Sequence, residues 1–292
     1  MNKSSTTALL VIPCTLLTLT FLVSGCGGGA TSEPTVTMKS ATLETSEESE
    51  TSDSGGGKTT DSSSSGGSGP GTIVGRILFE GTPPNLAPLV AQGANIKDAQ
   101  YCSAEPVPNQ SLVVGAGGGL ANVFIYLDGA PKGYEQSESF DPIPFDQENC
   151  KFIPHGLVVQ TGQVMNILNS DGCAHNTNVK AVRNKAFNST VNPNEKDGVP
   201  LIFEKPEKTP IKAVCDFHSW MSANVLVVDH PFAVCTSEDG TFEINDIPAG
   251  KYKFRVWHES ADFLERSYSV TVKPGEATQI ELKYDQSKFG KL

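Results

Sequence analysis

The stretch "CDFHSWMSANVLVVD", residues 215–229, decides how the folded part of this chain is interpreted. It places a thiol, an imidazole and a thioether three residues apart, at Cys215, His218 and Met221, directly before an apolar run typical of a strand. A blue-copper site uses one Cys thiolate, two His and a weak axial Met. A second imidazole, His175, follows the strand-like run in "VMNILNSDGCAHN". The four residues together predict a metal site built from two distant parts of the chain.

Copper suits this donor set for a physical reason. The soft thiolate donates charge to the metal, neutral imidazoles suit both copper oxidation states, and a distant thioether does not impose a square-planar shape. Cys-x-x-His could instead be half of a zinc site, but zinc prefers more Cys or His ligands. Met221 could fill the core, and Cys215 could be a buried apolar residue or half of a disulfide. Each alternative explains one residue, whereas a single copper ion explains all four.

Two longer stretches resemble the cupredoxin family. They are "FIPHGLVVQTGQVMNILNSDGCAHN", residues 152–176, and "IKAVCDFHSWMSANVLVV", residues 211–228. The first resembles the strand pair and His-Asn of that family, and the second resembles its final hairpin with the short amicyanin ligand loop. The resemblance implies a Greek-key β-sandwich over about residues 131–230 that binds one type 1 copper ion. The implied metal ligands are His175, Cys215, His218 and Met221.

The same resemblance implies roles for the residues around the metal. Asn176 would brace the two ligand loops by hydrogen bonding near the thiolate, as outer contacts do in metal sites. Phe217 and Trp220 would flank the copper within the ligand loop. The ring edge of His218 would lie near the surface in an apolar patch where electrons enter or leave. We predict an electron carrier and not an enzyme, because the five His of the chain cannot supply a trinuclear copper cluster.

The end of the chain resembles a second family. "TSEDGTFEINDIPAGKYKFRVWHE", residues 236–259, is similar to the second half of a carboxypeptidase-regulatory-like domain, which is a small transthyretin-like β-sandwich. The opening strands of such a domain lie about a hundred residues earlier, in "GTIVGRILFEG" and "LANVFIYLDG". We therefore expect an all-β chain in which the cupredoxin, residues 131–230, is inserted between residues 71–130 and 231–292. The alternative is a tandem order, with residues 71–230 forming one enlarged cupredoxin.

Short apolar runs bounded by Gly, Pro, Asn and Asp predict packed antiparallel sheets throughout the folded part. The N-terminal residues differ: 1–26 resemble a lipoprotein signal peptide, with the lipobox "LVSGC" ending at Cys26. Lipidation of Cys26 would anchor the protein to a bacterial membrane outside the cytoplasm. Residues 27–70, rich in Ser, Thr, Gly and Glu, predict a flexible linker.

Four cysteines remain for disulfides in an oxidising compartment, and they allow three pairings. We favour Cys102–Cys150 and Cys173–Cys235. The sequence also places the Cys173 thiol two residues before His175, so a sulfur atom is expected close to the metal site. The remaining histidines are interpreted as structural: His155, His230 and His258.

These features predict a membrane-tethered, extracytoplasmic type 1 copper protein that passes single electrons between redox partners such as a cytochrome, a dehydrogenase or an oxidase. The alternative is a non-redox copper-binding or delivery protein, or an adhesion lipoprotein with a structural copper site. The formal net charge of −11 and the pI near 4.9 argue against a nucleic-acid partner, because phosphate binding needs a basic face.

Overall fold

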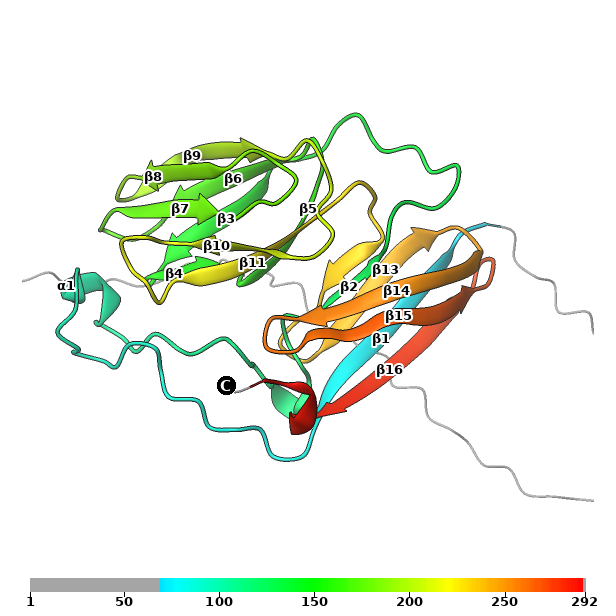
Figure 1. The fold of residues 1–292 in the computed structure, drawn as a ribbon, viewed down its shortest axis with the longest axis horizontal. Coiled ribbons are helices and arrows are strands. Elements are labelled where there is room, and N and C mark those ends of the chain that lie inside the picture. Colours follow the sequence, from blue (N-terminus) through cyan, green and yellow to red (C-terminus); the bar gives the residue numbers. More distant parts are fainter. Residues whose placement is uncertain (1–68, 291–292) are drawn as a thin grey trace, which may run out of the picture. The chain divides into compact units, whose positions relative to one another are not determined.

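The computed structural model describes residues 69–290, which form an almost entirely β structure of sixteen strands and three short helical segments (Figure 1). The all-β prediction is confirmed. No helix in these residues has the length and apolar character needed to cross a membrane. The predicted signal peptide, Cys26 and the linker lie outside the described residues, apart from the last two linker positions.

Two of the four sheets take strands from both ends of the described chain, and we call them the terminal sandwich. The first sheet has the order β13-β1-β16 and the second has the order β12-β2-β14-β15. The elements are β1 (Gly71–Glu80), β2 (Phe124–Leu127), β12 (Ala233–Cys235), β13 (Thr241–Ile247), β14 (Gly250–His258), β15 (Asp262–Val272), β16 (Ala277–Asp285) and the 3-10 helix η2 (Gln286–Lys288). Strand β1 pairs antiparallel with β13 and parallel with β16, so residues more than 160 positions apart are hydrogen-bonded neighbours.

Strand β1 explains how this pairing is specified. Its alternating pattern turns Ile73, Ile77 and Phe79 into one core, where they join apolar residues of β13, β14 and β16. Gly75 has a separate role, because a Cβ at this position would lie 2.4 Å from the carbonyl oxygen of Ile280 and 2.6 Å from the ring of Phe242. A larger residue there would push the neighbouring strand and ring away.

The other two sheets use residues 143–228 only, and we call them the central sandwich. Their orders are β4-β3-β6-β9 and β5-β11-β10-β7-β8. The elements are β3 (Ile143–Glu148), β4 (Lys151–Ile153), β5 (Gly156–Gln160), β6 (Val164–Asn169), β7 (His175–Val179), β8 (Phe187–Val191), β9 (Glu195–Ile202), β10 (Ile211–Val214) and β11 (Ser222–Val228). The expectation of wholly antiparallel sheets was wrong, since β3 pairs parallel with β6 and β5 parallel with β11.

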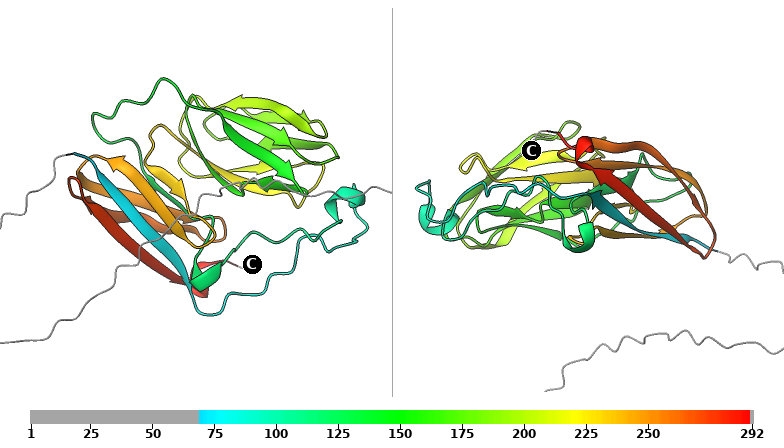
Figure 2. Two further views of the ribbon diagram at one scale, coloured as in Figure 1. Left: turned by 180° about the vertical axis from the view of Figure 1, so that it is seen from behind. Right: turned by 90° about the horizontal axis from the view of Figure 1, so that it is seen from below.

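A long connection, residues 81–123, joins β1 to β2, and we call it the strap (Figure 2). It contains the short helix α1 (Ala99–Cys102) and the 3-10 helix η1 (Ala116–Gly118). An isolated bridge between Val90 and Val107 closes its outer part into a loop. The predicted Cys102–Cys150 disulfide is present, and it ties α1 to the turn between β3 and β4. The strap therefore leaves the terminal sandwich and is bonded covalently to the central one.

The second predicted disulfide was wrong. Cys173 and Cys235 are both free thiols, and they belong to different apolar clusters. Cys173 lies in the core of the central sandwich, whereas Cys235 lies on β12 close to Gly156. Cysteine counting gave three pairings but held no information on which side of each core a sulfur faces.

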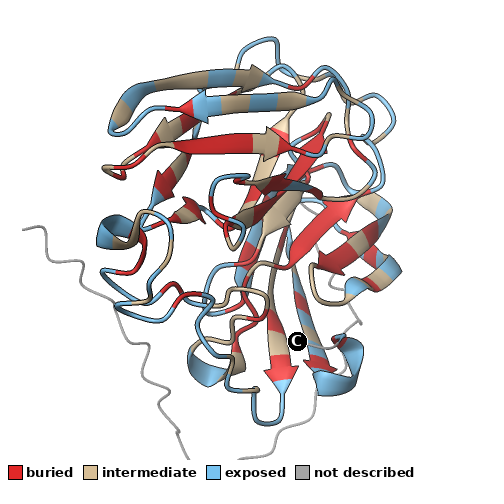
Figure 3. Cartoon of the chain, turned by 60° about the vertical axis from the view of Figure 1, so that its left-hand side comes forward, coloured by how far each residue is buried: buried red, intermediate tan, exposed pale blue. Residues whose placement is uncertain are grey.

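A third apolar cluster joins the two sandwiches. It takes Phe124 and Tyr126 from β2, Leu226 and Val228 from β11, and Trp257 from β14. Figure 3 shows buried residues along the strands of both sandwiches, while much of the connecting chain is exposed. The contacts in this cluster are between side chains, because no backbone ladder is shared by the two sandwiches.

We predict that Ile77→Ala lowers the free energy of unfolding by about 2–5 kcal/mol, because it leaves a cavity in the core shared by β1, β13 and β16. Chemical denaturation followed by fluorescence measures the loss. Leu78→Ala is the matched control, since Leu78 is only half-buried on the opposite face of β1, and it should cost clearly less. Equal losses for the two variants would contradict this account of the core.

Candidate metal centre

The hairpin of β10 and β11 positions three of the predicted ligands. Cys215 directly follows β10, and the loop from Cys215 to Met221 leads into β11. The loop is tight, because the amide N–H of Cys215 donates to the carbonyl of Met221 at 3.2 Å and the amide N–H of Met221 donates to the carbonyl of His218 at 2.9 Å. Strand β10 also pairs antiparallel with β7, whose first residue is His175. This pairing brings the fourth predicted residue to the same end of the sheet.

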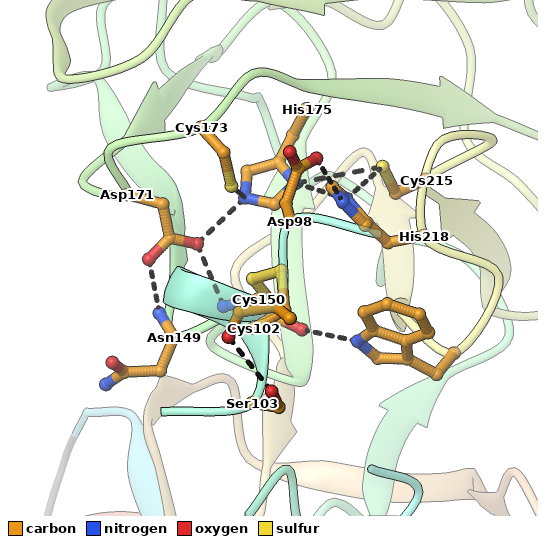
Figure 4. Close-up of a disulfide and its surroundings, with 12 residues drawn as sticks. Asp98, Cys102, Ser103, Asn149, Cys150, Asp171, Cys173, His175, Cys215 and His218 are labelled. Atoms are coloured by element: carbon orange, nitrogen blue, oxygen red, sulfur yellow. Dashed lines mark hydrogen bonds and ion pairs between the residues drawn. A yellow bond between two sulfur atoms is a disulfide. The ribbon is translucent and has the colours of Figure 1, made fainter. Parts of the chain in front are cut away.

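Three donor atoms of these residues converge at one point inside the protein (Figure 4). The Nδ1 atoms of His175 and His218 lie 2.9 Å apart. The sulfur of Cys215 lies 3.9 Å from Nδ1 of His175 and 3.8 Å from Nδ1 of His218. All three residues are buried, with both imidazoles fully inaccessible to solvent.

Two carboxylates fix which ring nitrogens carry protons. Nε2 of His175 lies 2.8 Å from a carboxylate oxygen of Asp171, and Nε2 of His218 lies 3.0 Å from one of Asp98. A carboxylate can only accept, so each Nε2 carries the proton that it donates. In the neutral rings, both Nδ1 lone pairs then point toward each other and toward the thiolate. An arrangement of this kind requires a cation, either a shared proton or a metal ion.

The donor triangle has the right size for a transition metal. A point equidistant from three atoms with these separations lies about 2.1 Å from each, which falls in the range of metal–nitrogen and metal–thiolate bonds in proteins. One thiolate and two imidazole nitrogens are also the equatorial donors of a blue-copper site. The residues present therefore fit a single copper ion.

The side-chain amide of Asn176 connects the two ligand segments. Its oxygen accepts hydrogen bonds from the backbone N–H of Asp216 at 2.7 Å and of Phe217 at 3.3 Å, and it lies 3.4 Å from the sulfur of Cys215. Its nitrogen donates to the carboxylate of Asp216 at 2.9 Å. Because Asn176 follows His175 directly, these bonds hold β7 against the start of the ligand loop.

The remaining residues of the ligand loop have different surroundings. Met221 is buried in the apolar core of the central sandwich. The Trp220 ring is half-buried, lies 5.2 Å from the His218 ring between centroids, and donates its Nε1–H to the carbonyl of Cys150. Phe217 is 38% exposed, and Nζ of Lys97 lies 4.6 Å from its ring centroid. Of the two aromatic rings, Phe217 is the more exposed.

The expected position of His218 was wrong. Its ring edge is buried, and the strap covers it by placing Asp98 on Nε2 (Figure 4). The resemblance to cupredoxins covered the ligand loop, but it did not include the strap and so could not predict that the strap covers His218. Sequence reasoning also missed Asp98 and Asp171 as partners of the imidazoles. Asp171 could have been found from its position four residues before His175, whereas no local pattern marks Asp98.

One thiol outside the triangle lies close to it. The sulfur of Cys173 is 3.7 Å from Nε2 of His175, as the sequence predicts. Burial, together with the charges of Asp171 and Asp98, raises the pKa of this thiol to about 12, so it is neutral. The other histidines have different partners: His155 pairs with Glu259, Nδ1 of His258 accepts from the backbone N–H of Ser260, and His230 stacks on Phe232.

The charges at the triangle favour a thiolate. Burial opposes ionisation of Cys215, but the imidazoles of His175 and His218 facing the sulfur outweigh it and lower the pKa of the thiol to about 6. Burial likewise opposes protonation of His175, yet its bonds to Asp171 and Cys215 raise the pKa of the imidazole. Cys215 is therefore ready to bind a metal at neutral pH without an external base.

No protein-family model matches the sequence, and no curated protein sequence matches it. Its structural neighbours are cupredoxins, matched over part of this chain. A copper-containing nitrite reductase from Thermus scotoductus is 18% identical over 34% of this chain and 25% of its own, with a TM-score of 0.27. A purple cupredoxin from Nitrosopumilus maritimus is 26% identical over 30% of this chain and 97% of its own, with a TM-score of 0.24. Amicyanin from Paracoccus versutus is 16% identical over 35% and 96%, with a TM-score of 0.26.

We predict that the metal-free protein gains one thiolate with a midpoint near pH 6, because the imidazoles lower the pKa of Cys215 to about 6. The absorbance of thiolate near 240 nm measures this step. Cys173 and Cys235 should stay silent there, because burial raises the pKa of each to about 12. Cys215→Ser should remove the step, and its persistence in that variant would contradict the assignment.

Proposed function

We propose that this protein is a non-enzymatic copper protein that transfers single electrons between redox partners outside the cytoplasm. One observation carries the proposal. Two imidazole Nδ1 atoms and one thiol sulfur converge with the spacing that a single copper ion needs, and the pKa of that thiol is lowered. When bound, copper supplies a one-electron couple. The redox partner would be another protein, such as a cytochrome, a dehydrogenase or an oxidase.

The chain's own residues keep the site rigid, which a fast one-electron couple requires. Cys215, His175 and His218 would hold the metal, and the buried thioether of Met221 would be a further, weak ligand. Asn176 fixes the spacing of the two ligand segments through its bonds to the backbone of Asp216 and Phe217. The dry surroundings exclude water from the donor atoms.

Because His218 is covered, we propose that electrons cross the protein surface at Phe217. This ring lies two residues from Cys215 along the chain and is the exposed aromatic group of the ligand loop. The nearby ammonium of Lys97 adds a positive charge at the same place. An electron would travel through the covalent path from the thiolate to Phe217 and not through the imidazole edge.

We predict that the copper-loaded full chain absorbs intensely in the visible region and that Cys215→Ser abolishes this band, because the band requires a thiolate ligand to Cu(II). Absorption and paramagnetic resonance spectra measure the result. Cys235→Ser is the matched control, since Cys235 is a free cysteine on β12, away from the triangle, and it should keep the colour. A coloured Cys215→Ser variant would remove the basis of the proposal.

Copper storage or delivery is the second candidate, and the strap favours it. It covers His218 through Asp98, which an electron carrier does not need and which would slow metal loss. Voltammetry separates the candidates: a reversible Cu(II)/Cu(I) couple at a rigid site supports electron transfer, and its absence supports delivery.

We also propose that the central sandwich is an inserted domain, residues 131–230, within a small transthyretin-like host formed by residues 71–130 and 231–292. The pairing of β1 with β13 and β16, and of β2 with β12 and β14, supports it. The proposed lipid on Cys26 and the linker of residues 27–70 would tether both to a bacterial membrane.

We predict that Cys26→Ser moves the protein from the membrane fraction to the soluble fraction, because it removes the sulfur that would carry the lipid. Fractionation of cells followed by detection of the full chain measures this. Cys14→Ser is the control, since Cys14 precedes the lipobox and its loss should leave attachment unchanged. Membrane attachment of the Cys26→Ser protein would contradict lipidation.

A further inference from the structure

Each imidazole of the donor triangle is bonded on its far side to a carboxylate. Asp171 accepts from Nε2 of His175 at 2.8 Å, and Asp98 accepts from Nε2 of His218 at 3.0 Å (Figure 4). Asp171 comes from the loop before β7, inside the central sandwich, while Asp98 comes from the strap. The triangle therefore has two carboxylates behind its two nitrogen donors, in addition to the thiolate.

Both carboxylates are held in place by contacts of their own. Asp171 also accepts from the backbone N–H of Asn149 at 2.7 Å and of Cys150 at 2.8 Å. Asp98 is fixed through its chain neighbours. Lys97, the residue before it, lies over the Phe217 ring. Cys102, four residues after Asp98, is bonded covalently to Cys150. Asp171 therefore cannot turn away from His175 without breaking two backbone hydrogen bonds, whereas the strap contacts hold the backbone of Asp98 close to His218.

We propose that Asp98 and Asp171 are positioning residues that set the oxidation state the site prefers, by stabilising Cu(II) more than Cu(I). The inference rests on the proposed copper site. A carboxylate that accepts from Nε2–H makes the opposite nitrogen more basic and fixes its direction. Its negative charge acts through the ring on the nitrogen that faces the metal. The Asp171 side chain is only 9% exposed and that of Asp98 is 33% exposed, so solvent screens the charge of Asp98 more. The higher charge of Cu(II) gains more from both effects than that of Cu(I).

The consequence is a low reduction potential, which selects the partner. The thiolate and the two carboxylates together carry three negative charges around the site, so adding an electron leaves more uncompensated charge in a buried place. The donor must accordingly be a stronger reductant than one serving a site with neutral surroundings. The strap contributes one of the two carboxylates. A connection between two strands of the terminal sandwich would therefore help to set the reduction potential of the copper site in the central sandwich.

The test compares isosteric variants of the copper-loaded full chain. Asp98→Asn removes the charge but keeps an oxygen that can accept from Nε2–H. We expect the ratio of Cu(I) to Cu(II) affinity to rise about tenfold, the lower end of outer-shell effects on metal sites and equivalent to 59 mV for a one-electron couple. Asp171→Asn should shift it in the same direction, although its two backbone bonds make it the riskier variant to fold.

Glu105→Gln is the matched control. Glu105 is an exposed carboxylate on the same strap, and the carboxylates bonded to the two imidazoles are Asp171 and Asp98. Its variant should change the affinity ratio less than threefold. A retained blue band in each variant shows that the fold and the triangle are intact. An unchanged potential in Asp98→Asn, or an equal shift in Glu105→Gln, would overturn the inference while leaving the copper site standing.

A measurement on the metal-free protein decides the positioning role independently of copper. Nitrogen NMR of histidine-labelled full chain should place the proton of His218 on Nε2 with slow exchange. Asp98→Leu, which removes the acceptor but fills the space, should release that preference. If His218 keeps the same protonated nitrogen and the same exchange rate in Asp98→Leu, Asp98 does not position the ring. If the wild-type chain takes up no copper at all, the proposed function fails, and this measurement still tests the carboxylate.

Discussion

The approach of two imidazole Nδ1 atoms to 2.9 Å is the contact on which the site depends. Each ring donates its Nε2 proton to a carboxylate, so in the neutral rings the two Nδ1 lone pairs face each other across the gap. In a dry interior such repulsion is costly unless a positive charge lies between the atoms. The two donor segments are nevertheless held close together, because β7 and β10 are neighbours in one sheet and their pairing fixes the positions of His175 and Cys215.

The contacts that hold this gap closed come from outside the sheet. In the strap, Asp98 accepts a hydrogen bond from His218 and Lys97 lies over the Phe217 ring. A disulfide also joins the strap to the turn after β3. On the other side, the amide of Asn176 connects β7 with the start of the ligand loop. The donor atoms are therefore fixed from two directions, one of which belongs to a connection of the terminal sandwich. This explains why the site is fully enclosed although its ligand loop lies at the end of a sheet.

Local spacing identified three residues that the structure brings together, His175, Cys215 and His218. The loop from Cys215 to Met221 and the His-Asn pair at the start of β7 are short patterns, and the strand pattern around them predicted the all-β fold. Contacts made over long sequence distances were not readable in the same way. Asp98 lies 120 residues from His218 in an irregular stretch without periodicity, so neither its role nor the burial of His218 followed from the chain. The Cys173–Cys235 pairing failed for a related reason, because composition cannot place two sulfurs in the same core.

The strap would also link metal loading to the folding of the terminal sandwich. A ligand bound only by the native state stabilises everything that must be ordered for binding. The strap covers His218, leaves β1 and returns to β2, and both strands belong to the terminal sandwich. Metal bound at the donor triangle would therefore contribute to the resistance of β1 and β2 to unfolding and proteolysis. An excised central segment would keep its ligands and lose this reciprocal support.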